Sequence, residues 1–389
     1  MPEEHEKLKE LATKRVSRRT FLMGMAGTAG LGIIGGALAS CAGANVGGTP
    51  TTTPGKTPAA APAASSAGSS TKFQGRTLRV MMNGGKYEEV ARAAVIEPFE
   101  KKYGVNVEIT PASSAEMMTR IRAEKSSPTV DFAIIDDLVA VGGYEEGLFE
   151  KIDPNNIPNL KNIDPAFLDQ AGYGPTVHGV PITFAYNKNL VKIAPPLSWA
   201  DLWKPDYKDM LAMCSIALTP SLLFLVQAAK MNGGDYDNID PGFAAIAKLM
   251  PNVKKWFHDL AEVRPAVDND GLIGIMGNSI WVDEMSKGIP LATVVPKEGA
   301  PFLANTAQII KGTKNKDLAE MLIDQYLSEE SQLGIVTGYA FTVVNKKVKV
   351  PDNLKAQVPD VSQVVHFDPV KIGNNRGAWT ERWNKDLKV

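Results

Sequence analysis

The sequence contains little cysteine and little histidine, and neither sign of charge dominates it. Two cysteines among 389 residues exclude a scaffold held together by disulfides. The four histidines are dispersed, without the Cys/His clustering that is typical of a metal site. Lys and Arg number 42 against 43 Asp and Glu, so there is no basic surplus for nucleic acid. We therefore expect no cofactor, no metal ion and no nucleic-acid partner.

Familiar catalytic motifs are also missing. The chain has no Gly-x-Ser-x-Gly turn, no phosphate-binding loop and no zinc-protease helix. The adjacent Asp136 and Asp137 suggest acid–base chemistry, but an N-cap followed by a first-turn aspartate explains them as well. We expect a protein that is not an enzyme. The alternative is a tethered cell-envelope hydrolase, which would need a nucleophile and a base to converge in a cleft.

The first forty residues have the pattern of an export signal. A charged segment ends in the pair Arg18-Arg19, and a Gly/Ala-rich apolar stretch follows at 23–39. This stretch is short and weakly apolar for a membrane-spanning helix, and paired arginines before such a region are typical of twin-arginine export. Residues 38–41 then resemble a bacterial lipobox. That resemblance implies cleavage before Cys41 and attachment of lipid to it.

The next thirty residues have the composition of a linker. Residues 42–71 consist mainly of Gly, Thr, Pro, Ala and Ser, and they show no apolar periodicity. We assign 1–40 to a signal peptide with a lipobox, and 41–72 to an anchored cysteine with a flexible linker. A chain of this length extends roughly 30 Å. These features predict an extracytoplasmic lipoprotein, held at a membrane by its anchor.

The remainder of the chain alternates short apolar runs with polar turns and helical patterns. Strands are predicted at 78–82, 131–135, 211–218 and 272–276, and a turn and a helix follow each of them. This alternation predicts an α/β fold with mostly parallel sheets that are covered by helices on both faces. Ligands of such sheets bind beyond the carboxyl ends of the strands, so the four turns are the candidate binding region.

Several segments resemble the family 1 solute-binding proteins of ABC transporters, and in particular their spermidine/putrescine-binding branch. These segments, which occur in the expected order, are 198–208, 248–253, 296–299, 315–317 and 338–339. The resemblance implies the two-lobed periplasmic-binding-protein fold, of a type II-like form, with a ligand cleft between α/β lobes. It further implies an N-terminal lobe of 73–182 plus 299–340, a C-terminal lobe of 183–298 plus 341–389, and a crossing strand at 182–187.

The resemblance also allows the pocket to be transferred position by position. Tyr87 and Tyr339 keep aromatic residues of the polyamine branch, whereas Gly84 stands in place of a Trp. Leu303-Ala304-Asn305 stands in place of a Trp-x-Asp motif, and neutral residues near Thr219 replace an acidic pair. Core packing is the alternative role for Tyr87 and for Trp281. The predicted ligand-binding residues are Gly84, Gly85, Tyr87, Asp136, Asp137, Thr219, Asn278, Trp281, Asn305 and Tyr339.

The missing acids and rings change the expected solute. A polyamine needs paired carboxylates and aromatic faces, whereas free helix N-termini favour an anion. We expect a small amine- or carboxylate-bearing solute, with an amino-acid-like zwitterion preferred over free spermidine. The resemblance implies that a monomeric protein closes on this solute and delivers it to an ABC permease. A sensor or scaffold protein with the same fold is a further alternative.

Overall fold

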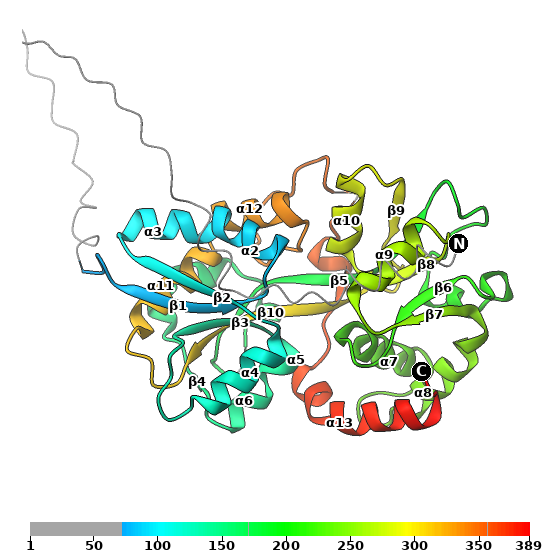
Figure 1. Cartoon of the computed structure of the whole chain (residues 1–389), viewed down its shortest axis with the longest axis horizontal. Coiled ribbons are helices and arrows are strands. Elements are labelled where there is room, and N and C mark those ends of the chain that lie inside the picture. The colour runs from blue at the N-terminus through cyan, green and yellow to red at the C-terminus, as the bar shows by residue number, and fades with distance from the viewer. Residues whose placement is uncertain (1–71, 170, 356) are drawn as a thin grey trace, which may run out of the picture. The chain divides into compact units, whose positions relative to one another are not determined.

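The computed structural model describes residues 72–169, 171–355 and 357–389, which form two lobes side by side (Figure 1). The strands are β1 (Thr77–Met82), β2 (Asn106–Pro111), β3 (Phe132–Asp136), β4 (Phe149–Glu150), β5 (Thr176–Asn187), β6 (Leu211–Cys214), β7 (Val253–Phe257), β8 (Ile273–Gly277), β9 (Leu291–Val294), β10 (Ala300–Ile310) and β11 (Val364–Val365). The α-helices are α2 (Lys86–Ala91), α3 (Glu97–Tyr103), α4 (Ser114–Ala123), α5 (Asp137–Ala140), α6 (Gly142–Glu145), α7 (Thr219–Met231), α8 (Asp240–Leu249), α9 (Leu260–Asp268), α10 (Asn278–Ser286), α11 (Lys316–Tyr326), α12 (Glu329–Tyr339) and α13 (Pro369–Asp386).

Parallel strands form the outer part of the sheet in each lobe. In the first lobe β1 pairs in parallel with β2 and β3, and in the second lobe β6 pairs in parallel with β7 and β8. The first four residues of β3 are buried, as expected of a strand with helices on both faces. The strand order β2-β1-β3-β10-β5-β8-β6-β7 confirms the predicted α/β fold and adds antiparallel strands at its centre.

Two central strands belong to both lobes. The first half of β5 pairs with β10, and its second half, Ile182 to Ala185, pairs with β8. Strand β10 begins beside β11, continues along β5 and ends beside β3. Figure 1 shows β5 and β10 running between the lobes. The crossing segment at 182–187 is therefore the second half of a longer strand.

Each lobe has its own hydrophobic core. One core includes Leu78, Phe132 and Phe302, and it also takes in Phe341 and Val344. The other core includes Phe184 and Leu211, together with Trp379 and Trp383 of α13. Because Phe341 and Val344 pack in the first core, the first lobe extends past the boundary that the sequence predicts at residue 340.

The structure corrects one predicted strand and shows how two helices begin. Strand β6 ends at Cys214, so the predicted strand at 211–218 is too long. Thr219 is the first residue of α7, and Leu218 occupies the N-cap position without a capping side chain. A π-helical turn, Arg92–Ile96, lies between α2 and α3.

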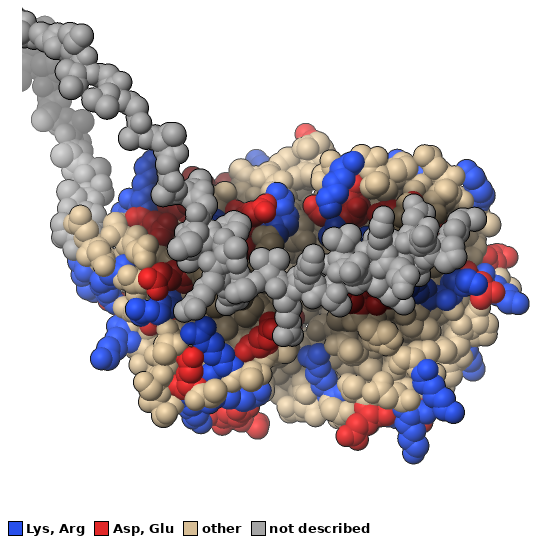
Figure 2. All heavy atoms as spheres, in the orientation of Figure 1, with Lys and Arg blue, Asp and Glu red and all other residues tan. Residues whose placement is uncertain are grey.

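Charged side chains of both signs are mixed on one face of the protein. On the face drawn in Figure 2, Lys and Arg alternate with Asp and Glu across both lobes, in agreement with the balanced composition. Within the described ranges, no helix has both the length and the apolarity to cross a bilayer. The same part of the chain contains no group of His, Cys, Asp and Glu that could hold a metal ion.

Candidate functional site

A cavity of about 680 Å³ opens between the two lobes, and we refer to it as the cleft. The segments that follow β1, β2 and β3 form its first-lobe wall, and the N-termini of α7 and α10 form its second-lobe wall. Val180 and Ile182 of β5 and Leu303 of β10 also line it. The cleft therefore lies at the carboxyl ends of parallel strands, where the sequence predicts a ligand. Six predicted residues line it: Gly84, Tyr87, Asp136, Thr219, Asn305 and Tyr339.

Asp136 is the one acidic residue among the described residues that line the cleft. It ends β3, and its partner in the antiparallel pairing with β10 is Asn305. The Asn305 amide donates a hydrogen bond of 2.6 Å to Oδ1 of Asp136, and the Asp136 backbone N–H donates one of 3.1 Å to Ser114 Oγ. Burial raises the pKa of Asp136 to about 6, although Asn305 and the charge of Arg376 oppose that shift. At neutral pH the cleft thus holds one fixed negative charge.

Aromatic rings pack behind this carboxylate in the first lobe. Tyr87 and Phe341 line the cleft, and the buried His178 lies between them, with ring centroids 5.0 Å from Tyr87 and 4.6 Å from Phe341. Burial lowers the pKa of His178 to about 3, so this histidine is neutral. The hydroxyl of Tyr87 is buried and lies beside that of Tyr326 in the first-lobe core. Tyr87 therefore offers the cleft a ring rather than a hydroxyl.

Two helix N-termini form the opposite wall. Leu218, Thr219 and Pro220 at the start of α7 line the cleft, as do Gly277 and Ser279 at the start of α10. Neither helix has a capping side chain. Backbone N–H groups in the first turn of a helix lack intrahelical partners, and the helix dipole places partial positive charge there. This wall favours a negatively charged group of a ligand.

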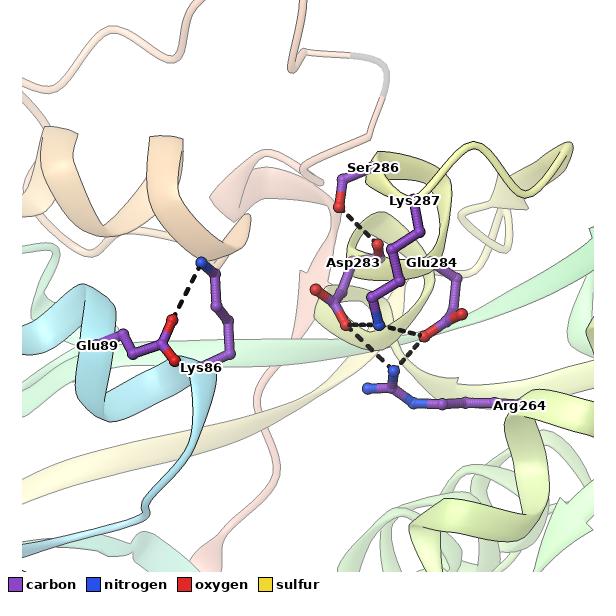
Figure 3. A network of polar contacts seen from close by, with 7 residues as sticks. All are labelled: Lys86, Glu89, Arg264, Asp283, Glu284, Ser286 and Lys287. Atoms are coloured by element: carbon purple, nitrogen blue, oxygen red, sulfur yellow. Dashed lines mark hydrogen bonds and ion pairs between the residues drawn. The ribbon is translucent and has the colours of Figure 1, made fainter.

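Charged residues from both lobes form polar networks near a smaller hollow, which shares Tyr339 with the lining of the cleft (Figure 3). On the first lobe, Lys86 of α2 pairs with Glu89 at 3.4 Å. On the second lobe, Asp283 accepts from Arg264 at 3.2 Å and from Lys287 at 2.8 Å. Lys86 and Asp283 both line this hollow of about 250 Å³, and each is paired with residues of its own lobe.

Comparison with known proteins identifies the family. The profile of the bacterial extracellular solute-binding proteins matches residues 94–359, about two thirds of the chain. The chain belongs to this family of solute-binding proteins. A spermidine/putrescine-binding periplasmic protein of Salmonella typhimurium is 25% identical over 317 residues, which cover 78% of this binding protein and 90% of the relative. A gamma-aminobutyric acid-binding protein of Pseudomonas aeruginosa is 23% identical, with coverage of 64% and 72% respectively.

The solved structures agree with this assignment. A crystal structure described as an ABC transporter from Clostridium perfringens has a TM-score of 0.71 and 27% sequence identity, and the match covers 79% of the binding protein and 99% of that chain. The family works with ABC permeases and binds small solutes, as the resemblance implied. The comparisons do not favour the hydrolase alternative.

Four predicted ligand-binding residues lie outside the cleft of the binding protein. Gly85 has a φ of 71° and serves as the N-cap of α2, so its role is conformational. Asp137 lines a different cavity, described below. Asn278 is fully buried and accepts a 3.5 Å hydrogen bond from Thr183. Trp281 is fully buried and packs against Gly274 in the second-lobe core. This position agrees with core packing, the alternative role given for Trp281 in the sequence analysis.

Other residues that line the cleft were missed at the sequence level. The segment from Pro111 to Ser114 joins β2 to α4 and forms part of the first-lobe wall. A visible signal marks it, because Ser113 and Glu116 form a capping box directly after a strand. Ile182 and Phe341 also line the cleft, and their contribution follows from the crossing strand and the tertiary fold rather than from a local motif.

Proposed function

We propose that this protein captures a small solute with one amino group and one carboxylate, by binding alone and without catalysis. The observation that carries the proposal is the single carboxylate of Asp136 opposite two uncapped helix N-termini. The first attracts an ammonium group and the second a carboxylate. The gamma-aminobutyric acid-binding relative supports this class of solute, whereas the spermidine/putrescine-binding relatives favour a polyamine.

The arrangement also supports closure of the lobes on the solute. The ammonium site belongs to the first lobe and the anion site to the second, so only a closed cleft satisfies both ends of one small molecule. A ligand that contacts both lobes stabilises the closed state by its differential affinity for that state. We propose that a permease recognises the closed monomer.

Calorimetric titration with 4-aminobutyrate, butylamine, butyrate and spermidine tests the proposed solute class. We expect 4-aminobutyrate to bind at least about tenfold more tightly than butylamine or butyrate, because each of those lacks one of the two charged groups. Butylamine and butyrate are the matched controls, since they keep the chain length of the zwitterion. Micromolar binding of spermidine, with no binding of 4-aminobutyrate, would show that the solute is a polyamine.

We propose further that the protein is a membrane-tethered lipoprotein exported by the twin-arginine route. This proposal rests on Arg18-Arg19 and Cys41, which lie outside the described residues, and on the periplasmic relatives.

Metabolic labelling with a radioactive fatty acid tests the anchor in cells that express the full chain. We expect label on the natural sequence and on Cys214→Ala, because Cys214 is buried in the folded body, but none on Cys41→Ala. Label that persists in Cys41→Ala would exclude the proposed site.

A further inference from the structure

A second cavity, of about 630 Å³, lies on the other face of the central sheet, and we refer to it as the back cavity. Successive residues of a strand point to opposite faces. On β10, Asn305 accordingly lines the cleft and Thr306 lines the back cavity. At the end of β3 the same division separates the adjacent aspartates, with Asp136 in the cleft and Asp137 in the back cavity. Each cavity thus receives one carboxylate of the pair.

Asp137 is a buried carboxylate. The residue is 6% exposed, and its Oδ1 accepts a 2.8 Å hydrogen bond from the N–H of Leu138. Its own backbone N–H also stabilises the carboxylate, and the residue lines the back cavity. Burial of a carboxylate costs free energy unless a cation or donor meets it, and burial accordingly raises the pKa of Asp137.

The charge around the back cavity is of one sign. Asp169 and Asp368 also line it, and no Lys or Arg does so among the residues that the structure describes there. These two carboxylates are engaged locally. Asp169 accepts from the backbone of Ala171 at 2.8 Å, and Asp368 accepts from the backbone of Val370 at 2.9 Å. Asp137 is therefore distinguished from them by burial, since Asp169 is half-buried and Asp368 is exposed.

The walls around Asp137 are aromatic and apolar. Tyr144 and Phe167 come from the first lobe, and Phe367 comes from the segment that leads into α13 of the second lobe. His366, whose ring centroid lies 5.4 Å from that of Phe167, has a pKa lowered by burial and adds no positive charge. Aromatic faces and a desolvated carboxylate together are the groups that recognise an ammonium ion attached to an apolar body.

We propose that the back cavity is a second binding site, for a small primary amine with an apolar body whose ammonium group donates to Asp137. This site is separate from the cleft and takes no carboxylate, because the described lining supplies acids and aromatic rings without a cation. It also spans both lobes, with Asp137 on one side and Phe367 on the other.

Calorimetric titration with benzylamine tests this site, using the natural protein and the variants Asp137→Asn and Asp136→Asn. Asp136→Asn removes the carboxylate of the cleft, so benzylamine binding that survives in this variant belongs to the back cavity. We expect saturable binding that persists in Asp136→Asn and is weakened about tenfold or more by Asp137→Asn. Asparagine at 137 keeps an oxygen for the N–H of Leu138 and removes only the charge. Absence of saturable binding, or loss through Asp136→Asn instead, would overturn the proposal.

A second pair of variants tests the site without altering a buried group. Val370 lines the back cavity and is 46% exposed, so substitution there is tolerated by the fold. We expect Val370→Lys to weaken benzylamine binding severalfold by placing a like charge at the entrance, whereas Val370→Met, of similar length, leaves it unchanged. Equal affinities in the two variants would contradict an ammonium site at this position.

Discussion

Asp136→Asn is expected to weaken binding of an amine-bearing solute about 100-fold. Asp136 supplies the carboxylate of the described cleft lining, and loss of one partner of a desolvated charge pair costs about 2–5 kcal/mol. Asparagine keeps an oxygen that can accept from Asn305, so the pairing of β3 with β10 is retained. Calorimetry with 4-aminobutyrate, on the natural protein and the variant at pH 7, measures the difference. Asp137→Asn is the matched control, since its side chain faces the back cavity.

Asp136→Asn is also expected to abolish the pH dependence of solute affinity. Because the pKa of Asp136 is raised to about 6, this carboxyl is mostly ionised at pH 7 and mostly protonated at pH 5. We expect the affinity of the natural protein to fall about tenfold over that interval and that of Asp136→Asn to stay constant. The folded state holds the Asp136 proton more tightly than the unfolded chain, so ionisation of this group lowers stability as the pH rises. The variant should therefore be at least as stable at pH 7. Unchanged affinity in Asp136→Asn would remove this residue from the site.

Gly174→Ala is expected to lower the free energy of unfolding by about 3 kcal/mol or more. Gly174 immediately precedes the segment that enters β5, and a Cβ there would lie 1.2 Å from the carbonyl oxygen of Ala307 on β10. The obstacle is backbone, so no rotamer change relieves it. Ala307 is also held in place, because its N–H donates a 3.0 Å hydrogen bond to the carbonyl of Pro175. Urea unfolding followed by circular dichroism measures the loss.

Gly377→Ala is the matched control for this substitution. Gly377 is an exposed residue within α13, and a Cβ there meets nothing within 4 Å. Alanine is a better helix former, so we expect a gain of about 0.5–1 kcal/mol. If both alanine variants unfolded at the same urea concentration as the natural protein, the close approach of Gly174 to β10 would not limit stability.

The local elements were predictable where short-range pattern determines them. The buried strand β3, the turn after β1 and the helix α10 all follow from apolar runs and polar turns in the sequence. The central place of β10 was not predictable in this way. Residues 300–310 pair with β3 and β5, which lie more than a hundred residues earlier, and no local signal encodes such partners.

The candidate site was likewise predictable only in part from the sequence. The resemblance placed Asn305 at the pocket, and the structure puts it against Asp136. The sequence pattern assigns Asp136 and Asp137 to the same site. Adjacent residues at the end of a strand point to opposite faces of the sheet, and this separation follows only when the end of β3 is known. Asn278 and Trp281 follow a strand as a ligand-binding turn would. Both side chains are nevertheless buried, Trp281 in the second-lobe core and Asn278 against the carbonyl of Gln357.

The position of β10 also governs when the chain can fold during its synthesis. Strand β3 lies between β1 and β10, and β10 is made about 165 residues after β3. Until then one edge of the nascent β3 has no partner, and exposed strand edges promote aggregation. The second core waits longer, because Trp379 and Trp383 of α13 come almost last. Neither lobe can therefore be completed on the ribosome as an early unit, because each needs segments from the final third of the chain.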